Sequence, residues 1–241
     1  MRVKLILSYD GSHYYGSQIQ PGKPTVHGKL AEVFKILNID TKIDFSGRTD
    51  KDVHAFKQVV SCDIPEHFSK DLKAFRNTLN KLLPNSIYVR YASLENDRFH
   101  ARFSAKRREY RYIFTDKKPS PFNSSYISYY ENIDCKKINT ALKYFTGVHD
   151  FEYFSKKGSD PVSTTREIYD IRLYRYKDIY VLKFSANSYL RSQIRMMVDF
   201  IMKISSGRLT IPQLEQQLDK QKLVSWTLAP PYGLYLSKIS Y

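Results

Sequence analysis

The chain has 241 residues, 42% of them hydrophobic, which is enough to bury the core of one large or two modest domains without disulfides. No segment approaches the roughly twenty apolar residues of a membrane span, and the N-terminus lacks the apolar run of a signal peptide, so we expect a cytoplasmic protein. The net charge of +15, with 20 tyrosines and 14 phenylalanines, indicates a polyanionic partner and favours RNA or single strands over duplex DNA.

The chain begins with a predicted strand, helix and second strand. Residues 3–9 lie in a segment that alternates charged and apolar side chains, as a strand does. Thr25 is expected to cap a helix whose apolar residues line one side. These residues are Val26, Leu30, Val33, Phe34 and Leu37. A strand is expected to precede the polar loop at residues 47–55.

The first half continues with strand, helix and strand. Residues 59–64 and 87–92 predict strands, and Ser69 is expected to cap the helix between them. The apolar positions of that helix are Leu72, Phe75, Leu79 and Leu82. The resulting order is βαββαβ, the split βαβ unit.

The second half predicts a similar order. Residues 108–115 form a strand, and a helix follows that Gly147 closes. Residues 168–176 and 179–186 predict a hairpin about Lys177-Asp178. The helix that Gly147 closes has its apolar positions at Ile138, Leu142 and Phe145. A second helix is expected from about Ser188, and a last strand at residues 234–239. The inward residues of that second helix are Leu190, Ile194, Met197, Val198 and Ile201.

This duplication predicts an α/β fold of the α+β type. We expect two RRM/ferredoxin-like βαββαβ halves, residues 1–98 and 99–241, with antiparallel sheets and helices on one face. The crossing between them is expected within residues 94–102. A cleft between two such halves is a favoured place for binding, so we expect the active site there.

The two cysteines are not at disulfide or metal-ligand spacings. Cys62 falls in a predicted strand and Cys135 near a helix start, with no second cysteine or histidine suitably spaced. We expect both to be reduced and structural, and we expect no zinc.

The loop after Phe45 concentrates reactive groups in a segment that has no core to fill. It contains Gly47, Arg48, Thr49 and Asp50, and a loop of this kind commonly presents a site. A nearby cation and loop amides could keep Asp50 ionised, as a nucleophilic carboxylate requires. The alternative is an Asx-type or hydroxyl turn, with Arg48 pointing to water.

Four ordered segments resemble the motifs of the tRNA pseudouridine synthase A family, nearly from end to end of the chain. They are residues 47–50 followed by 53–55, residues 99–105 followed by 108–112, residues 186–190 with Arg195 on the same predicted helix, and residues 229–236. The resemblance implies two related halves with the active site between them. It also implies isomerisation of uridine to pseudouridine in tRNA, with no cofactor consumed.

The resemblance implies a role for each candidate site residue. Asp50 is the catalytic residue, and Arg195 is assigned to pair with it, the alternative being an exposed helix arginine. Tyr110 would stack on the flipped uracil and help to move its C5 proton, or else only pack on the sheet. Arg48 would fill the gap of the extruded base or grip its phosphate, and Leu234 would form an apolar wall.

Further positions near these motifs have weaker assignments. The densest basic run is expected to contact the RNA backbone or simply to face solvent. It comprises Lys106, Arg107, Arg108 and Arg111. His54 is expected to hydrogen-bond a loop rather than to transfer protons, because no partner group is suitably spaced.

The chain departs from the family pattern at two places. Lys51-Asp52 stands where the family usually has Ala-Gly, and aspartate tolerates a positive φ better than most residues, so we expect a local adjustment. Residues 196–199 lack the usual asparagine and glycine, which affects the expected helix packing rather than the chemistry.

Several functions are compatible with the sequence. The first is a tRNA pseudouridine synthase acting on the anticodon stem-loop at uridines 38 to 40, as a homodimer. Asp50 would either attack C1′ or remove the C2′ proton. The alternatives are a synthase acting on another RNA uridine, a non-catalytic tandem RNA-binding module, or a nucleosidase or glycosidase with Asp52 as second carboxylate.

Overall fold

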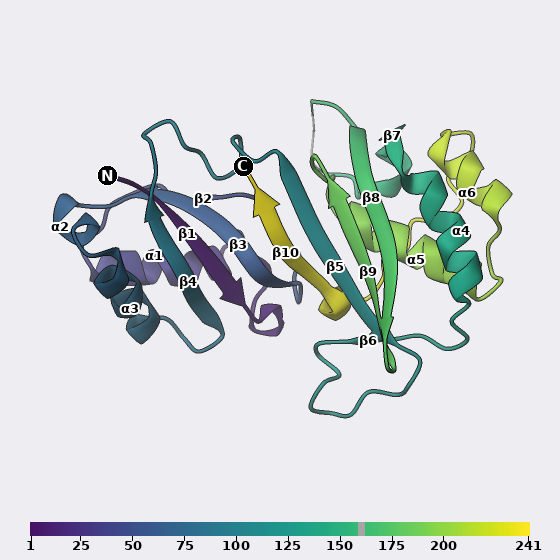
Figure 1. Ribbon diagram of the computed structural model, residues 1–241, viewed down its shortest axis with the longest axis horizontal. Coiled ribbons are helices and arrows are strands. Elements are labelled where there is room, and N and C mark those ends of the chain that lie inside the picture. The colour runs from purple at the N-terminus through teal and green to yellow at the C-terminus, as the bar shows by residue number, and fades with distance from the viewer. Residues whose placement is uncertain (159–161) are drawn as a thin grey trace. The chain divides into compact units, whose positions relative to one another are not determined.

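The computed structural model describes residues 1–158 and 162–241 (Figure 1). These residues form two compact units, Met1–Lys106 with Tyr235–Tyr241, and Arg107–Leu234. Among the described residues, no helix is both long and apolar enough to cross a membrane. The α/β class predicted from the sequence is confirmed, because each unit combines a sheet with helices.

The first unit contains a sheet with strand order β4-β1-β3-β10, and β2 pairs with β3. Its elements are β1 (Arg2–Tyr9), α1 (Val26–Ile36), β2 (Asp44–Phe45), β3 (His54–Asp63), α2 (Glu66–Ser69), α3 (Leu72–Leu82), β4 (Ile87–Leu94) and β10 (Leu234–Ser240). Strand β1 runs antiparallel to β3 and β4. Strand β10 runs parallel to β3, with Tyr235 opposite His54. The predicted last strand therefore exists, but it pairs with a strand of the first half of the sequence.

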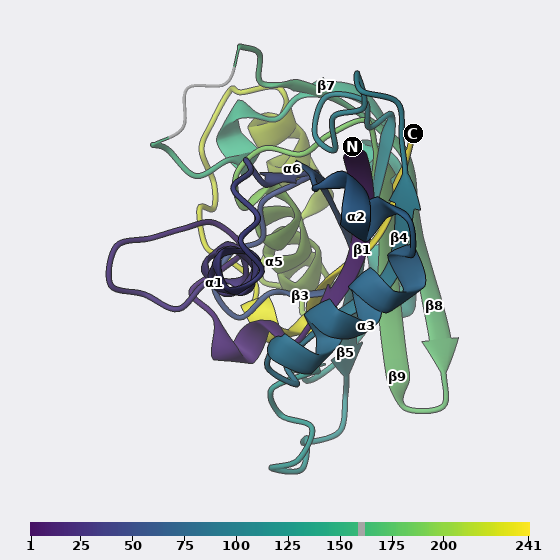
Figure 2. The same cartoon turned by 90° about the vertical axis from the view of Figure 1, so that its left-hand side faces the viewer.

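The core of this unit follows from the periodicities of its elements. Alternate residues of β1 are buried, and α1 buries one face. Phe34 of α1 and Phe75 of α3 have ring centroids 6.5 Å apart, so the two helices pack against each other. Figure 2 shows α1 nearly end-on, together with α3. The predicted cap of α1 is confirmed, because the Thr25 hydroxyl accepts the N–H of Gly28 at 3.1 Å.

The predicted cap of α3 is wrong by two residues. The N-cap is Asp71, whose carboxylate accepts the N–H of Ala74 at 2.8 Å. Ser69 instead ends the short helix α2, where its hydroxyl donates to the Glu66 carbonyl at 2.7 Å. A separate turn of helix before α3 occupies Ser69 and leaves the cap to the next suitable side chain.

The second unit contains a sheet with strand order β5-β9-β8-β7, and β6 pairs in parallel with β5. Its elements are β5 (Arg107–Thr115), β6 (Ser128–Tyr129), α4 (Cys135–Phe145), β7 (Gly147–Asp150), β8 (Thr165–Tyr176), β9 (Ile179–Ala186), α5 (Gln193–Ser205) and α6 (Ile211–Leu218). The predicted hairpin is confirmed as β8 and β9, with Lys177 at a φ of 53°. Gly147 follows the end of α4 with a φ of 108°, as expected for a residue that closes a helix.

One helix of this unit starts later than predicted, and another was not predicted. Helix α5 begins at Gln193 rather than near Ser188, because Ser192 adopts a left-handed φ of 59°. Leu190 therefore lies before the helix, where the side chain of Gln193 accepts its N–H at 2.8 Å. Helix α6 was not predicted, although Thr210 and Gln213 form a capping box at its start.

Candidate active site

The loop between β2 and β3 presents Asp50. Asp50 is half-buried, and Arg48, two positions earlier in the chain, is exposed. Asp52 has a φ of 62°, the left-handed conformation that a glycine would adopt without cost. The expected adjustment at Lys51-Asp52 is therefore confirmed, and the loop turns without the glycine.

A segment after β1 supports the Asp50 loop through its backbone. The N–H of Thr49 donates to Ser17 Oγ at 2.9 Å, and the N–H of Ser17 donates to the Thr49 carbonyl at 3.1 Å. A Cβ on Gly16 would lie 2.6 Å from the Thr49 oxygen, and one on Gly11 would lie 2.2 Å from the Val53 oxygen. Only glycine permits this approach, so the two backbones are fixed against each other.

A buried polar cluster lies on the other side of the same loop. The Gln58 side chain on β3 is fully buried, and its Nε2 donates to the Gly47 carbonyl at 2.9 Å. The Tyr9 hydroxyl lies 2.8 Å from Thr49 Oγ1 and 3.4 Å from Gln58 Nε2. Burial raises the pKa of Tyr9 to about 12. Gln58 was not among the predicted site residues, although a glutamine before an apolar strand run is a signal of a buried polar contact.

His54 begins β3 and is 2% exposed. Its Nδ1 accepts the N–H of Gly11 at 3.0 Å and lies 3.2 Å from Asp10 Oδ1. Its ring stacks on Tyr235, with centroids 4.6 Å apart. The prediction that His54 hydrogen-bonds a loop is confirmed.

Tyr110 lies on β5 in the second unit and is 7% exposed. Its ring meets the ring of Tyr189 edge to face, with centroids 5.3 Å apart. The neighbouring Phe114 is fully buried and stacks on Tyr180 at 5.4 Å, so it packs in the sheet as expected. Tyr189 comes from the loop before α5, which means that two of the four sequence motifs meet at Tyr110.

Arg195 on α5 joins the third and fourth motifs. Its Nε donates to the carbonyl of Ala229 at 2.8 Å, and the N–H of Ala229 donates to the Arg195 carbonyl at 3.0 Å. Leu234, at the end of the same segment, is 6% exposed. A Cβ on Gly233 would lie 2.7 Å from the carbonyl oxygen of Ile113, so the fourth motif also approaches β5 closely.

The basic run divides into exposed and engaged residues. Lys106, Arg107 and Arg111 are exposed. The Arg107 guanidinium lies over the Tyr169 ring at 4.7 Å. Arg108 is half-buried and donates to the carbonyl of Asn187 at 2.8 Å, which gives it a structural contact within the unit.

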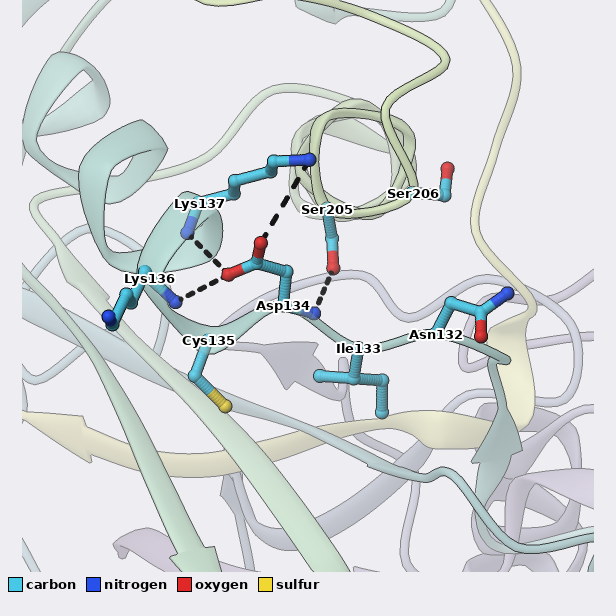
Figure 3. A pocket seen from close by; sticks show the side chains of 8 residues that line it. All are labelled: Asn132, Ile133, Asp134, Cys135, Lys136, Lys137, Ser205 and Ser206. Carbon is cyan, nitrogen blue, oxygen red and sulfur yellow. Dashed lines mark hydrogen bonds and ion pairs between the residues drawn. The ribbon is translucent and has the colours of Figure 1, made fainter.

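A pocket of about 660 Å³ at the start of α4 contains none of the predicted site residues (Figure 3). Its carboxylate, Asp134, caps α4 by accepting the N–H groups of Lys136 and Lys137 at 2.9 and 3.1 Å. The hydrogen bond from the backbone N–H of Lys137 is the main cause of the lowered pKa of Asp134. The carboxylate of this pocket therefore serves the helix end.

Both cysteines are free, and the described residues contain no cluster of candidate metal ligands. Within residues 1–158 and 162–241, no group of three or more histidine, cysteine and acidic side chains is arranged to hold a metal ion. Cys62 is free and buried in β3, and burial raises its pKa to about 12. Cys135 is also free.

The units divide the predicted site residues between them. The first unit carries Arg48 and Asp50 on one loop, and the second carries Tyr110, Arg195 and Leu234. Within the second unit, the structure brings the last three of the four sequence motifs together on β5 and α5.

Comparison with known proteins gives a consistent result over the whole chain. A family model described as tRNA pseudouridine synthase matches residues 5–104 and 141–241. A tRNA pseudouridine synthase A of Campylobacter jejuni subsp. doylei is 40% identical over 241 residues, covering 100% of both chains. One from Wolinella succinogenes is 40% identical over 98% of this chain and 92% of its own, and one from Helicobacter pylori is 34% identical over 99% and 98%. The resemblance read from the four motifs is confirmed, and the chain belongs to the tRNA pseudouridine synthase family.

Proposed function

We propose that this protein isomerises uridine to pseudouridine in the anticodon stem-loop of tRNA, at positions 38 to 40, with Asp50 as the catalytic carboxylate. The observation that carries the proposal is the setting of Asp50. It is half-buried on a loop whose backbone is hydrogen-bonded on one side to Ser17 and on the other to Gln58. A reacting group needs such fixed placement, and family membership indicates the reaction.

The chemistry requires a single carboxylate and no consumed cofactor. The N1–C1′ bond of uridine breaks, the uracil turns, and a C5–C1′ bond forms, while C5 loses a proton and N1 gains one. Asp50 acts either by attacking C1′ and later being displaced by C5, or by removing the C2′ proton and returning it. Because the uracil stays in the pocket, no second carboxylate has to activate water.

The remaining site residues are assigned to binding and orientation. Tyr110 would stack on the extruded uracil, and the edge-to-face contact with Tyr189 supports a fixed ring position. Arg195 would orient the Asp50 carboxylate with its guanidinium, and Leu234 would provide an apolar wall for the base. Arg48, which is exposed beside Asp50, would hold the phosphate or fill the gap left by the base.

The partner is proposed to be tRNA. Its phosphates would be bound electrostatically, because the chain has 39 basic and only 24 acidic side chains. Lys106, Arg107 and Arg111 would contact the backbone, whereas Arg108 would contribute mainly through its bond to Asn187. We also propose that the protein acts as a homodimer in the cytoplasm, as the family resemblance implies.

Product analysis tests this function directly. The protein is incubated with unmodified transcripts of several tRNAs, and pseudouridine is mapped along each. Pseudouridine at positions 38 to 40 supports the proposal, and modification only elsewhere would place the target outside the anticodon stem-loop. Release of free uracil would indicate a nucleosidase, and unchanged RNA that still binds would indicate a binding module.

A further inference from the structure

Gln58 is a fully buried amide whose hydrogen-bonding capacity is used almost entirely beneath the Asp50 loop. Its Oε1 accepts the hydroxyl of Ser46 at 2.7 Å and the N–H of Val59 at 3.1 Å. Its Nε2 donates to the carbonyl of Gly47 at 2.9 Å and to the Tyr9 hydroxyl at 3.4 Å. An amide offers two donors and one carbonyl acceptor, so no group of this side chain is left to solvent.

These contacts reach the chain on the N-terminal side of Asp50 at two separate points. Ser46 and Gly47 are held directly by Gln58. Thr49, the residue immediately before Asp50, is held through Tyr9, whose oxygen lies 2.8 Å from Thr49 Oγ1. The Tyr9 oxygen accepts a hydrogen from Gln58, and its hydroxyl shares a second hydrogen bond with Thr49. The bond between Tyr9 and Thr49 connects the end of β1 with a loop residue forty positions further along the chain.

The cluster is suited to holding geometry rather than to exchanging protons. Burial raises the pKa of Tyr9 to about 12, further from neutral pH than that of an exposed tyrosine, so the hydroxyl stays protonated there. Thr49 is only 6% exposed, and its N–H is bound to Ser17 Oγ on the opposite side. The residue preceding Asp50 is therefore fixed by both its backbone and its side chain.

We propose that Gln58, acting through Tyr9 and Thr49, is a positioning residue that sets where the Asp50 carboxylate meets the ribose of the target uridine. This inference rests on the proposed function of Asp50. Loss of these hydrogen bonds would let the loop shift, although every residue of the loop, Asp50 included, would still be present. A displacement of about 1 Å at a reacting group can lower a rate about a hundredfold.

The first test compares two variants that each remove one amide. Gln58→Met keeps the length and volume of the side chain but removes its bonds. The matched control is Asn80→Leu, because Asn80 of α3 in the same unit accepts the N–H of Val89 at 2.7 Å and donates to its carbonyl at 2.9 Å. Thermal unfolding, tRNA affinity and the single-turnover rate of pseudouridine formation at saturating tRNA are measured for both.

We expect both variants to unfold at lower temperature, and only Gln58→Met to lose rate. Its single-turnover rate should fall about a hundredfold while the tRNA dissociation constant changes by less than about threefold, the signature of lost alignment rather than lost binding. A Gln58→Met rate that stays at the wild-type level, or one that falls no further than that of Asn80→Leu, would overturn the proposal. Absence of pseudouridine from the wild-type reaction would instead refute the proposed function itself.

A second pair of variants tests the relay at Thr49. Thr49→Val keeps the shape but removes the hydroxyl that meets Tyr9, whereas Thr49→Ser keeps the hydroxyl. We expect Thr49→Val and Tyr9→Phe to share the rate defect of Gln58→Met, and Thr49→Ser to restore most of the rate. Equal rates for the serine and valine variants would show that this hydroxyl does not position Asp50.

Discussion

Arg195 and Ala229 bind each other reciprocally, with Arg195 Nε donating to the Ala229 carbonyl at 2.8 Å and the Ala229 N–H donating to the Arg195 carbonyl at 3.0 Å. The first bond fixes the direction of the guanidinium, and the second fixes the segment that leads to Leu234. A planar guanidinium can be held by one nitrogen and present its other N–H groups elsewhere. A lysine ammonium has a single nitrogen and lacks this geometry.

The pairing predicts different outcomes for two substitutions of Arg195. Arg195→Met should lower kcat about a hundredfold, because both the cation and its fixed direction are lost. Arg195→Lys should retain intermediate activity, because the charge survives without the planar fork. Steady-state kinetics on an unmodified tRNA transcript measure both. Equal activity of lysine, methionine and wild-type proteins would show that Arg195 serves only the structure of this segment.

Asp50→Asn should abolish pseudouridine formation while tRNA still binds, because the amide can neither attack C1′ nor remove the C2′ proton. Asp52→Asn is the matched control, since asparagine also tolerates the left-handed φ of 62° at that position. The control should stay active, and its inactivation would favour a two-carboxylate hydrolase. Turnover by Asp50→Asn near the wild-type rate would remove Asp50 from the mechanism.

Tyr110 is expected to contribute both its ring and its hydroxyl. Tyr110→Phe should keep tRNA affinity and lose most of the rate, and Tyr110→Ala should weaken both, because the stacking surface is also lost. Affinity by filter binding and single-turnover rates separate the two effects. If the wild-type, Tyr110→Phe and Tyr110→Ala proteins have the same affinity and rate, Tyr110 only packs in the sheet.

The Tyr189 hydroxyl is buried and makes no hydrogen bond among the described residues. Tyr189→Phe should therefore raise the free energy of unfolding by about 1 kcal/mol, since it removes a desolvated donor that nothing offsets. Tyr112→Phe should have the opposite effect, because that hydroxyl lies 2.8 Å from Ser128 Oγ and also donates to the Pro230 carbonyl. Urea unfolding curves decide the signs, and a destabilised Tyr189→Phe protein would contradict the first expectation.

Salt dependence tests the assignment of the basic run. Replacing Lys106 and Arg107 with alanine should flatten the slope of log affinity against log salt by up to about two, because fewer counterions are released on binding. The matched control replaces the exposed Lys70 and Lys73 and removes the same charge near the start of α3. A wild-type slope in the first variant would mean that the RNA follows a different path.

Local patterns in the sequence were sufficient for much of the fold and for the position of the Asp50 loop. Several features depend only on residues close together in the chain. They are the alternation in β1, the Thr25 cap, the β8–β9 hairpin and the left-handed conformation of Asp52. Such features follow from periodicity and backbone sterics, which a single sequence contains. The cap of α3 was predicted wrongly at Ser69, because Asp71, an equally suitable side chain two residues further on, was not considered.

Tertiary structure decided the features that join distant segments. The pairing of Tyr235 with His54 and the reach of Gln58 to Gly47 and Tyr9 depend on strand order and burial. The late start of α5 depends on Ser192 and on the loop before it. A buried polar side chain binds whichever group the fold brings within reach, so its partner cannot be read from its neighbours in the chain. For this reason the sequence singled out Asp50 as a candidate, whereas the contacts that hold its loop emerged only from the folded chain.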